Sequence, residues 1–204
     1  MGTLRHPSTP ANFRSPFLLC CGLELATGSE AEEDVRRRLS DLFDRHSLDR
    51  WTFSDRVVVA EGATPHSHPV ITLATEYPHD TALLCSYLHE QLHWWSTSCP
   101  GAAVGHADRV FGVLRERYGM LPARPPEGCG SQRSNLIHLH VCWLEVEVLA
   151  ELFGWQWARR RAEHVPLYRS IYRAVIEDRE ELRKLFVPAG MELPAAEEHQ
   201  ADHR

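Results

Sequence analysis

The sequence lacks a surplus of positive charge. Its 22 Lys and Arg residues are outnumbered by 28 Asp and Glu residues, which gives a formal net charge of -6 and a pI near 6.1. Nothing in this balance would neutralise a phosphate backbone or an acidic membrane surface. We therefore expect neither nucleic acid nor a membrane as a partner.

Two further absences concern cysteine pairs and long apolar segments. The six cysteines include no C-x-x-C pair, which argues against a structural zinc knuckle. The apolar stretch from Phe17 to Leu25 is interrupted by Glu24, and it is too short to span a bilayer. These features predict a cytoplasmic protein whose thiols are reduced.

Histidine and tryptophan, by contrast, are frequent, with 13 His and 6 Trp in 204 residues. The remaining composition, 43% hydrophobic and 25% charged, is that of an ordinary folded protein, and the length suits a single domain. Imidazole is the side chain most used for proton transfer and metal ligation near neutral pH. Histidine clusters are therefore the first place to look for function.

The sequence pattern predicts a loose leader over residues 1–28, a folded domain over 29–187 and a flexible tail over 188–204. Apolar periodicity predicts helices at 30–46, 80–96, 105–118, 135–153 and 166–186, and strands at 56–60 and 70–74. The predicted fold class is α+β. It is a mostly helical single domain with a small antiparallel strand pair that precedes the helix at 80–96.

The motif H-E-x-x-H lies within the predicted helix at 80–96, as His89, Glu90 and His93. Residues four apart share one face of a helix, so both imidazoles can reach one zinc ion at about 2.0–2.1 Å. Glu90 is turned away from this face by about a quarter of the helix circumference. Its carboxylate can therefore contact a water at the metal without becoming a ligand.

A third ligand must come from elsewhere, because a catalytic zinc usually holds three side chains and a water. The extended pattern H-E-x-x-H-x-x-G-x-x-H is absent, since Ser96 and Cys99 stand at its later positions. The helix at 135–153 offers Glu145, which its apolar stripe turns toward the core. An unpaired buried carboxylate is costly, and a metal would compensate for its desolvation. Glu145 is the predicted ligand.

Other residues remain as alternatives for this site. Glu147 is a reserve ligand, and Glu145 itself could instead form a buried salt bridge. His138 lies two turns from Glu145 on the same stripe, so it is a candidate ligand or a catalytic donor to the developing oxyanion. Cys85, one turn before His89, is also within reach, although a small buried thiol is the commoner reading. The loop pair His66 and His68 is expected to be solvated.

These residues resemble the zincin metallopeptidases, specifically the group whose third ligand is a glutamate on a following helix. The stretches 87–94 and 138–145 are also similar to an uncharacterised bacterial family that carries H-E-Q-L-H-W. The zincin resemblance implies His89 and His93 as zinc ligands and Glu90 as general base. It also implies an edge strand near 70–74, beside which an extended peptide could lie.

The site therefore suggests a zinc-dependent hydrolase, a peptidase or amidase, that acts on a peptide or a small amide through a metal-activated water and Glu90. The alternative is a non-catalytic metal-binding or structural protein, in which His138 or Cys85 closes the coordination sphere. Iron or manganese in a His/carboxylate site used for redox chemistry is a third possibility.

Overall fold

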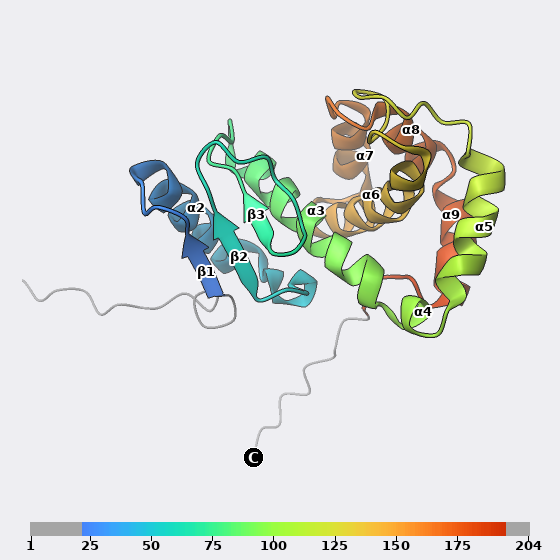
Figure 1. Ribbon diagram of the computed structural model, residues 1–204, viewed down its shortest axis with the longest axis horizontal. Helices are drawn as coiled ribbons and strands as arrows, with labels where there is room; N and C mark the ends of the chain where they lie inside the picture. Colours follow the sequence, from blue (N-terminus) through green and yellow to red (C-terminus); the bar gives the residue numbers. More distant parts are fainter. Residues whose placement is uncertain (1–21, 195–204) are drawn as a thin grey trace, which may run out of the picture.

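The computed structural model describes residues 22–194, and these residues are mostly helical (Figure 1). A small sheet and one long helix lie at one end of the molecule, a second long helix runs from there to the centre, and most of the remaining helices gather at the other end (Figure 1). The helices are α2 (Glu30–His46), α3 (Asp80–Ser98), α4 (Pro100–Ala103), α5 (His106–Tyr118), α6 (Gln132–Phe153), α7 (Trp155–Glu163), α8 (Arg169–Glu177) and α9 (Arg179–Phe186). Two 3-10 helices, η1 (Leu48–Trp51) and η2 (Val187–Ala189), complete the helical elements.

The sheet has three strands, β1 (Gly22–Leu25), β2 (Arg56–Val59) and β3 (Ile71–Leu73), in the order β1-β2-β3. Both pairs are parallel, so the predicted antiparallel arrangement of the last two strands is wrong. The reason is the connection over residues 60–70. It is long enough to return along the four-residue strand β2, so β3 begins at the same end of the sheet as β2 and runs in the same direction. On the way, His66 pairs with Thr72 in the antiparallel sense.

The first strand lies inside the segment that the sequence analysis assigned to a leader. Gly22–Leu25 pairs with the whole of β2, from Arg56 to Val59. The expectations for residues 1–21 and 195–204 lie outside the described residues. The helical α+β class holds in its coarse form, with the strands placed before α3 as expected.

Two helices, α3 and α6, form the centre of the molecule. α3 packs against α2 and β3 on one side and against α6 on the other, while α7 and α8 pack on α6. Neither α3 nor α6 has an interior Gly or Pro. The His79 side chain accepts from the Ala82 N–H at the start of α3, and Ser131 caps α6 in the same way from Ser134. Both helices are buried on several faces, which suits a central position.

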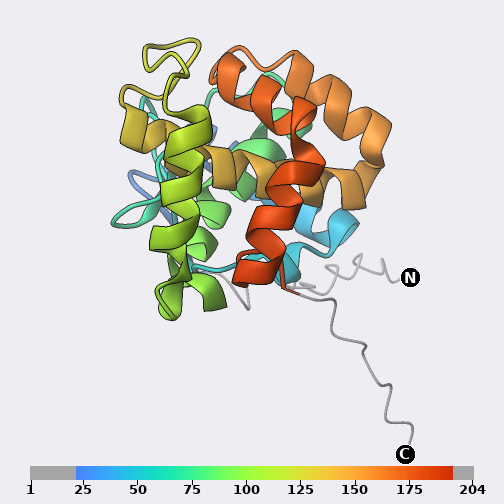
Figure 2. The same ribbon diagram turned by 90° about the vertical axis from the view of Figure 1, so that its right-hand side faces the viewer.

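The C-terminal helices differ from the expectation of one helix over 166–186. α8 ends at Glu177 and α9 begins at Arg179, with Asp178 between them at φ -108° and ψ 22°. Figure 2 shows these helices, in orange and red, covering α6 together with α5. Within the described residues, no helix is both long and apolar enough to cross a membrane.

Candidate metal centre

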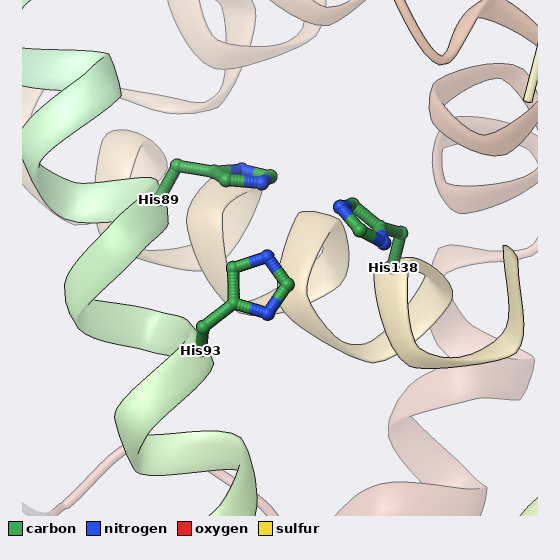
Figure 3. Close-up of side chains that lie close together, drawn as sticks. All are labelled: His89, His93 and His138. Carbon is green, nitrogen blue, oxygen red and sulfur yellow. The ribbon is translucent and has the colours of Figure 1, made fainter. Parts of the chain in front are cut away.

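Three histidine rings converge between α3 and α6 (Figure 3). His89 and His93 lie one turn apart on α3, and His138 faces them from α6. The ring centroids are 5.0 Å apart for His89 and His93, 4.8 Å for His93 and His138, and 5.4 Å for His89 and His138. One nitrogen from each ring lies within 4.8 Å of the other two, so the three can hold one metal ion.

Two of the rings are oriented by hydrogen bonds through Nδ1. His89 Nδ1 lies 2.9 Å from a carboxylate oxygen of Glu145, and His138 Nδ1 lies 2.9 Å from the Ser134 carbonyl oxygen. Both partners are acceptors, so Nδ1 carries the proton in each ring. The lone pair of a neutral ring is then on Nε2, the arrangement that metal-binding histidines commonly have.

The protonation of two of the three rings, His93 and His138, also suits metal binding. Burial, together with the neighbouring histidines, holds the pKa of His93 far below its usual value. Burial likewise lowers the pKa of His138 to about 4. For His89, burial lowers the pKa, but the hydrogen bond and charge of Glu145 outweigh it and the net pKa is raised. His93 and His138 are therefore neutral at pH 7, as ligands must be.

Glu145 is buried, but it lies behind His89 rather than beside His93. The same carboxylate oxygen that faces His89 Nδ1 accepts from the Tyr172 hydroxyl at 2.6 Å. Glu145 does belong to a second possible metal group, with His89 and Cys142. The Glu145 carboxylate is already hydrogen-bonded, because Tyr172 and His89 both donate to it. The desolvation that suggested a metal partner is thus offset by two donors.

The other alternative ligands point elsewhere. Glu147 forms a two-pronged ion pair with Arg179, with distances of 2.6 and 2.9 Å. Cys85 is buried, and burial raises the pKa of its thiol to about 12. Within residues 22–194, no fourth His, Cys, Asp or Glu joins the three converging histidines.

Glu90 is buried beside the centre and is not one of the grouped side chains. Burial raises its pKa, against the opposing charges of His89 and His66. A carboxylate with this placement could exchange a proton with a water bound to a metal at the three histidines. Its role as general base stays a prediction.

The sequence analysis did not identify two tyrosines near the three histidines: Tyr168, just before α8, and Tyr172, within it. The Tyr168 ring lies 4.7 Å from the His138 ring and 6.0 Å from the His89 ring. Its backbone is left-handed, with φ +58°, an uncommon conformation for a residue with a side chain and one that often occurs near functional sites. The sequence around Pro166 did not indicate this conformation, because tyrosine has no preference for the left-handed region.

The loop between β2 and β3 packs against the helix that carries the motif, through Trp94. Trp94, the residue after His93, donates from Nε1 to the Ser67 carbonyl oxygen at 2.8 Å. The ring of His68 stacks on Trp94 at 4.5 Å with an interplanar angle of 18°. His66 and His68 are exposed, as expected, but the loop that carries them is attached to the helix of the motif.

Comparison with known proteins found no relative of this chain. The chain matches no protein family, no curated protein and no solved structure. The interpretation of the site therefore depends on its own geometry.

Proposed function

We propose that this protein is a metal-dependent hydrolase that cleaves amide bonds, with zinc as the metal. The observation that carries the proposal is the convergence of three imidazoles on one point without a fourth ligand from the described residues. A catalytic zinc is typically held by three side chains, with a further position left for water or substrate. A structural zinc would need four.

The ligands in this proposal are His89, His93 and His138. This assignment differs from the sequence-based prediction, because Glu145 takes the supporting role that a carboxylate commonly has behind a metal-binding histidine. Its contact with His89 Nδ1 fixes the ring orientation and the tautomer. His138, which was considered as an oxyanion donor, is then used as the third ligand.

Glu90 supplies proton transfer in this proposal. Zinc bound to the three histidines would polarise the substrate carbonyl and lower the pKa of the attacking water. Glu90 would accept the proton of that water and return it to the leaving amine. Its burial favours this exchange, because a raised carboxyl pKa brings the group closer to the pH at which it must work.

The proposal is tested with the Glu90→Gln variant of the zinc-loaded protein. Glutamine keeps the shape of the side chain but cannot accept the proton, so amide hydrolysis is expected to fall by about 10²–10⁴-fold. Zinc content is expected to stay at one equivalent. Glu116→Gln, an exposed substitution on α5, is the matched control and should leave both quantities unchanged. Loss of zinc in Glu90→Gln, or unaltered hydrolysis, would contradict the role of Glu90.

A closed, non-catalytic site makes a different prediction. It requires a fourth side chain, and a zinc-loaded protein with such a site would bind no added chelating inhibitor. The site geometry gives this alternative less support than the open one, since Cys85 and Cys142 are not grouped with His93.

A further inference from the structure

We infer that the metal centre acts on compact substrates, of the size of one acyl amide, rather than on extended polypeptides. This inference rests on the proposed hydrolase function and narrows its substrate class. Three features of the structure lead to it: the occupied edge of β3, the attachment of the β2–β3 loop to α3, and the position of Tyr168.

The outward-facing backbone groups of Thr72, in the middle of β3, are already paired. Peptides that bind as an added strand depend on unpaired N–H and C=O groups at a sheet edge. The Thr72 N–H donates to the His66 carbonyl at 2.8 Å, and the Thr72 carbonyl accepts from the His66 N–H at 3.1 Å. One residue beyond the strand, the Ala74 N–H donates to the Tyr77 hydroxyl at 3.2 Å.

The other edge of β3, which faces β2, is also fully paired. β3 pairs with β2 along its length, and the Leu73 carbonyl accepts from the Ala60 N–H at 3.0 Å. A peptide that followed β3 would therefore have to displace the segment around His66. The sequence-based resemblance implied a substrate in this place, and the chain's own loop occupies it.

The loop is held where it is by contacts to the motif helix. Trp94 binds the Ser67 carbonyl through Nε1 and stacks on His68, so displacement of the loop would break both contacts. Trp94 follows His93 directly on α3. The loop therefore limits the approach to the three histidines from the side of the sheet.

Tyr168 limits the approach from the side of α8. Its ring packs over His138 and faces His89, and its backbone is fixed by the start of α8, where the Tyr168 carbonyl accepts from the N–H groups of Ile171 and Tyr172. Hollows lie elsewhere: one of about 570 Å³ beside α7 and α8, and one of about 680 Å³ between α5 and α6. None of the three histidines lines either hollow, so neither provides a groove that leads a polypeptide to the centre.

The experiment compares two hydroxamates, which bind zinc through the same chelating group. Acetohydroxamate and the hydroxamate of a blocked tetrapeptide are titrated into the zinc-loaded protein, and their dissociation constants are measured. Pairing with a free strand edge would add two or more hydrogen bonds, and the tetrapeptide would then bind tighter by roughly tenfold or more. That result would overturn the inference. A smaller gain, or weaker binding of the tetrapeptide, supports it.

A failure of the proposed function gives a different result. If the protein holds zinc but neither hydroxamate binds, the coordination sphere is closed, and the hydrolase proposal falls together with the inference. If both hydroxamates bind and the tetrapeptide hydroxamate binds tenfold or more tightly than acetohydroxamate, the metal site stands. The inference that substrates are compact is then wrong.

A pair of variants tests the role of the loop backbone. His66→Pro removes the N–H that donates to Thr72, so the tetrapeptide hydroxamate is expected to gain affinity while acetohydroxamate does not. His66→Ala keeps the backbone N–H and should preserve the selectivity of the parent protein. Equal behaviour of the two variants would contradict the proposed role of the edge.

A measurement on the metal-free parent protein does not depend on any variant folding. Amide hydrogen exchange at Thr72 is expected to be slow, because its N–H is bonded to His66. Exchange at the rate of an unfolded chain would show that the edge is open, and it would overturn the inference.

Discussion

Glu145 accepts a hydrogen bond from Nδ1 of His89 at 2.9 Å, deep in the contact between α3 and α6. The two residues are 56 positions apart in the sequence, and their contact joins the two central helices beside the three converging histidines. A second donor, the Tyr172 hydroxyl, approaches the same carboxylate oxygen from α8. The orientation of His89 therefore depends on three helices, and it is set before any metal binds.

The first prediction concerns Glu145→Gln. If Glu145 only orients His89, the variant is expected to bind zinc about 10–100-fold more weakly than the parent protein. His93→Ala, which removes a ligand, is expected to lose zinc altogether. Competition with a chromophoric chelator measures both affinities, and Glu147→Gln, whose parent side chain pairs with Arg179, is the control. If Glu145→Gln lost zinc as completely as His93→Ala, Glu145 would be a ligand.

The second prediction separates the possible roles of His138. As the third ligand, it is required for binding, so His138→Ala is expected to lower zinc affinity by at least about 100-fold. The fold should persist, because the hydrogen bond that His138 donates goes to the Ser134 carbonyl within its own helix. Zinc content and the circular dichroism spectrum are measured together, with the exposed His164→Ala as control. Unaltered zinc affinity in His138→Ala would exclude it as a ligand.

The third prediction is about stability at the motif helix. Gln91 is fully buried, and its Oε1 accepts from the N–H groups of Phe53 and Ser54 at 2.7 and 2.8 Å. Its Nε2 donates to the Ser54 carbonyl at 3.0 Å and to the Tyr87 hydroxyl at 3.1 Å. Gln91→Leu keeps the volume but removes the side-chain partner of the Phe53 N–H, the Ser54 N–H and the Ser54 carbonyl, while the Tyr87 hydroxyl keeps its hydrogen bond with Thr52 Oγ1 at 2.7 Å.

We expect Gln91→Leu to lower the free energy of unfolding by about 2–4 kcal/mol, measured by urea denaturation. The control Gln156→Leu, on the exposed face of α7, should change it by less than about 0.5 kcal/mol. A loss as small as that of the control would show that water replaces the lost partners at no cost.

Much of the helical structure could be predicted because local signals agree with one another. Ser29 caps α2, acidic residues follow in its first turn, and the helix covers the predicted residues 30–46. α7 was not predicted, because it begins directly after Gly154 with no side-chain cap. The break at Asp178 has no Gly or Pro to mark it, so α8 and α9 read as one helix.

The candidate metal centre was predictable only in part, for a reason of geometry. The H-E-x-x-H spacing places His89 and His93 on one face of a helix whatever the rest of the chain does. His138 and Glu145 share a stripe of α6, and both were expected near the metal. Which of them faces the ring nitrogens depends on how far along α3 the two helices cross. That offset is a tertiary feature, and neither helix carries a signal for it.

The last prediction concerns the dependence of stability on pH at Glu32, in the first turn of α2. Its side chain is fully buried and accepts from three backbone N–H groups: Thr27 at 2.9 Å, Gly28 at 2.8 Å and Glu61 at 3.1 Å. The hydrogen bond from Thr27, together with those from Glu61 and Gly28, outweighs desolvation and lowers the carboxyl pKa below its ordinary value of 4.5. Glu32 therefore connects the end of β1 with the loop that follows β2.

A carboxyl group whose pKa is lowered in the folded state stabilises the protein above its unfolded pKa, and this contribution is lost as the pH falls through the folded value. Glu32→Gln cannot accept all three bonds, so it is expected to be less stable than the parent protein at pH 7. The difference should narrow as the pH falls below about 4.5, because the parent carboxylate becomes protonated while glutamine does not titrate. Urea denaturation at pH 7 and at several values below 4.5 measures this, with the exposed Glu30→Gln in the same helical turn as control. If the stability difference between the parent protein and Glu32→Gln stayed constant with pH, Glu32 would act through its shape. Only protonation of the Glu32 carboxylate can make that difference smaller at low pH.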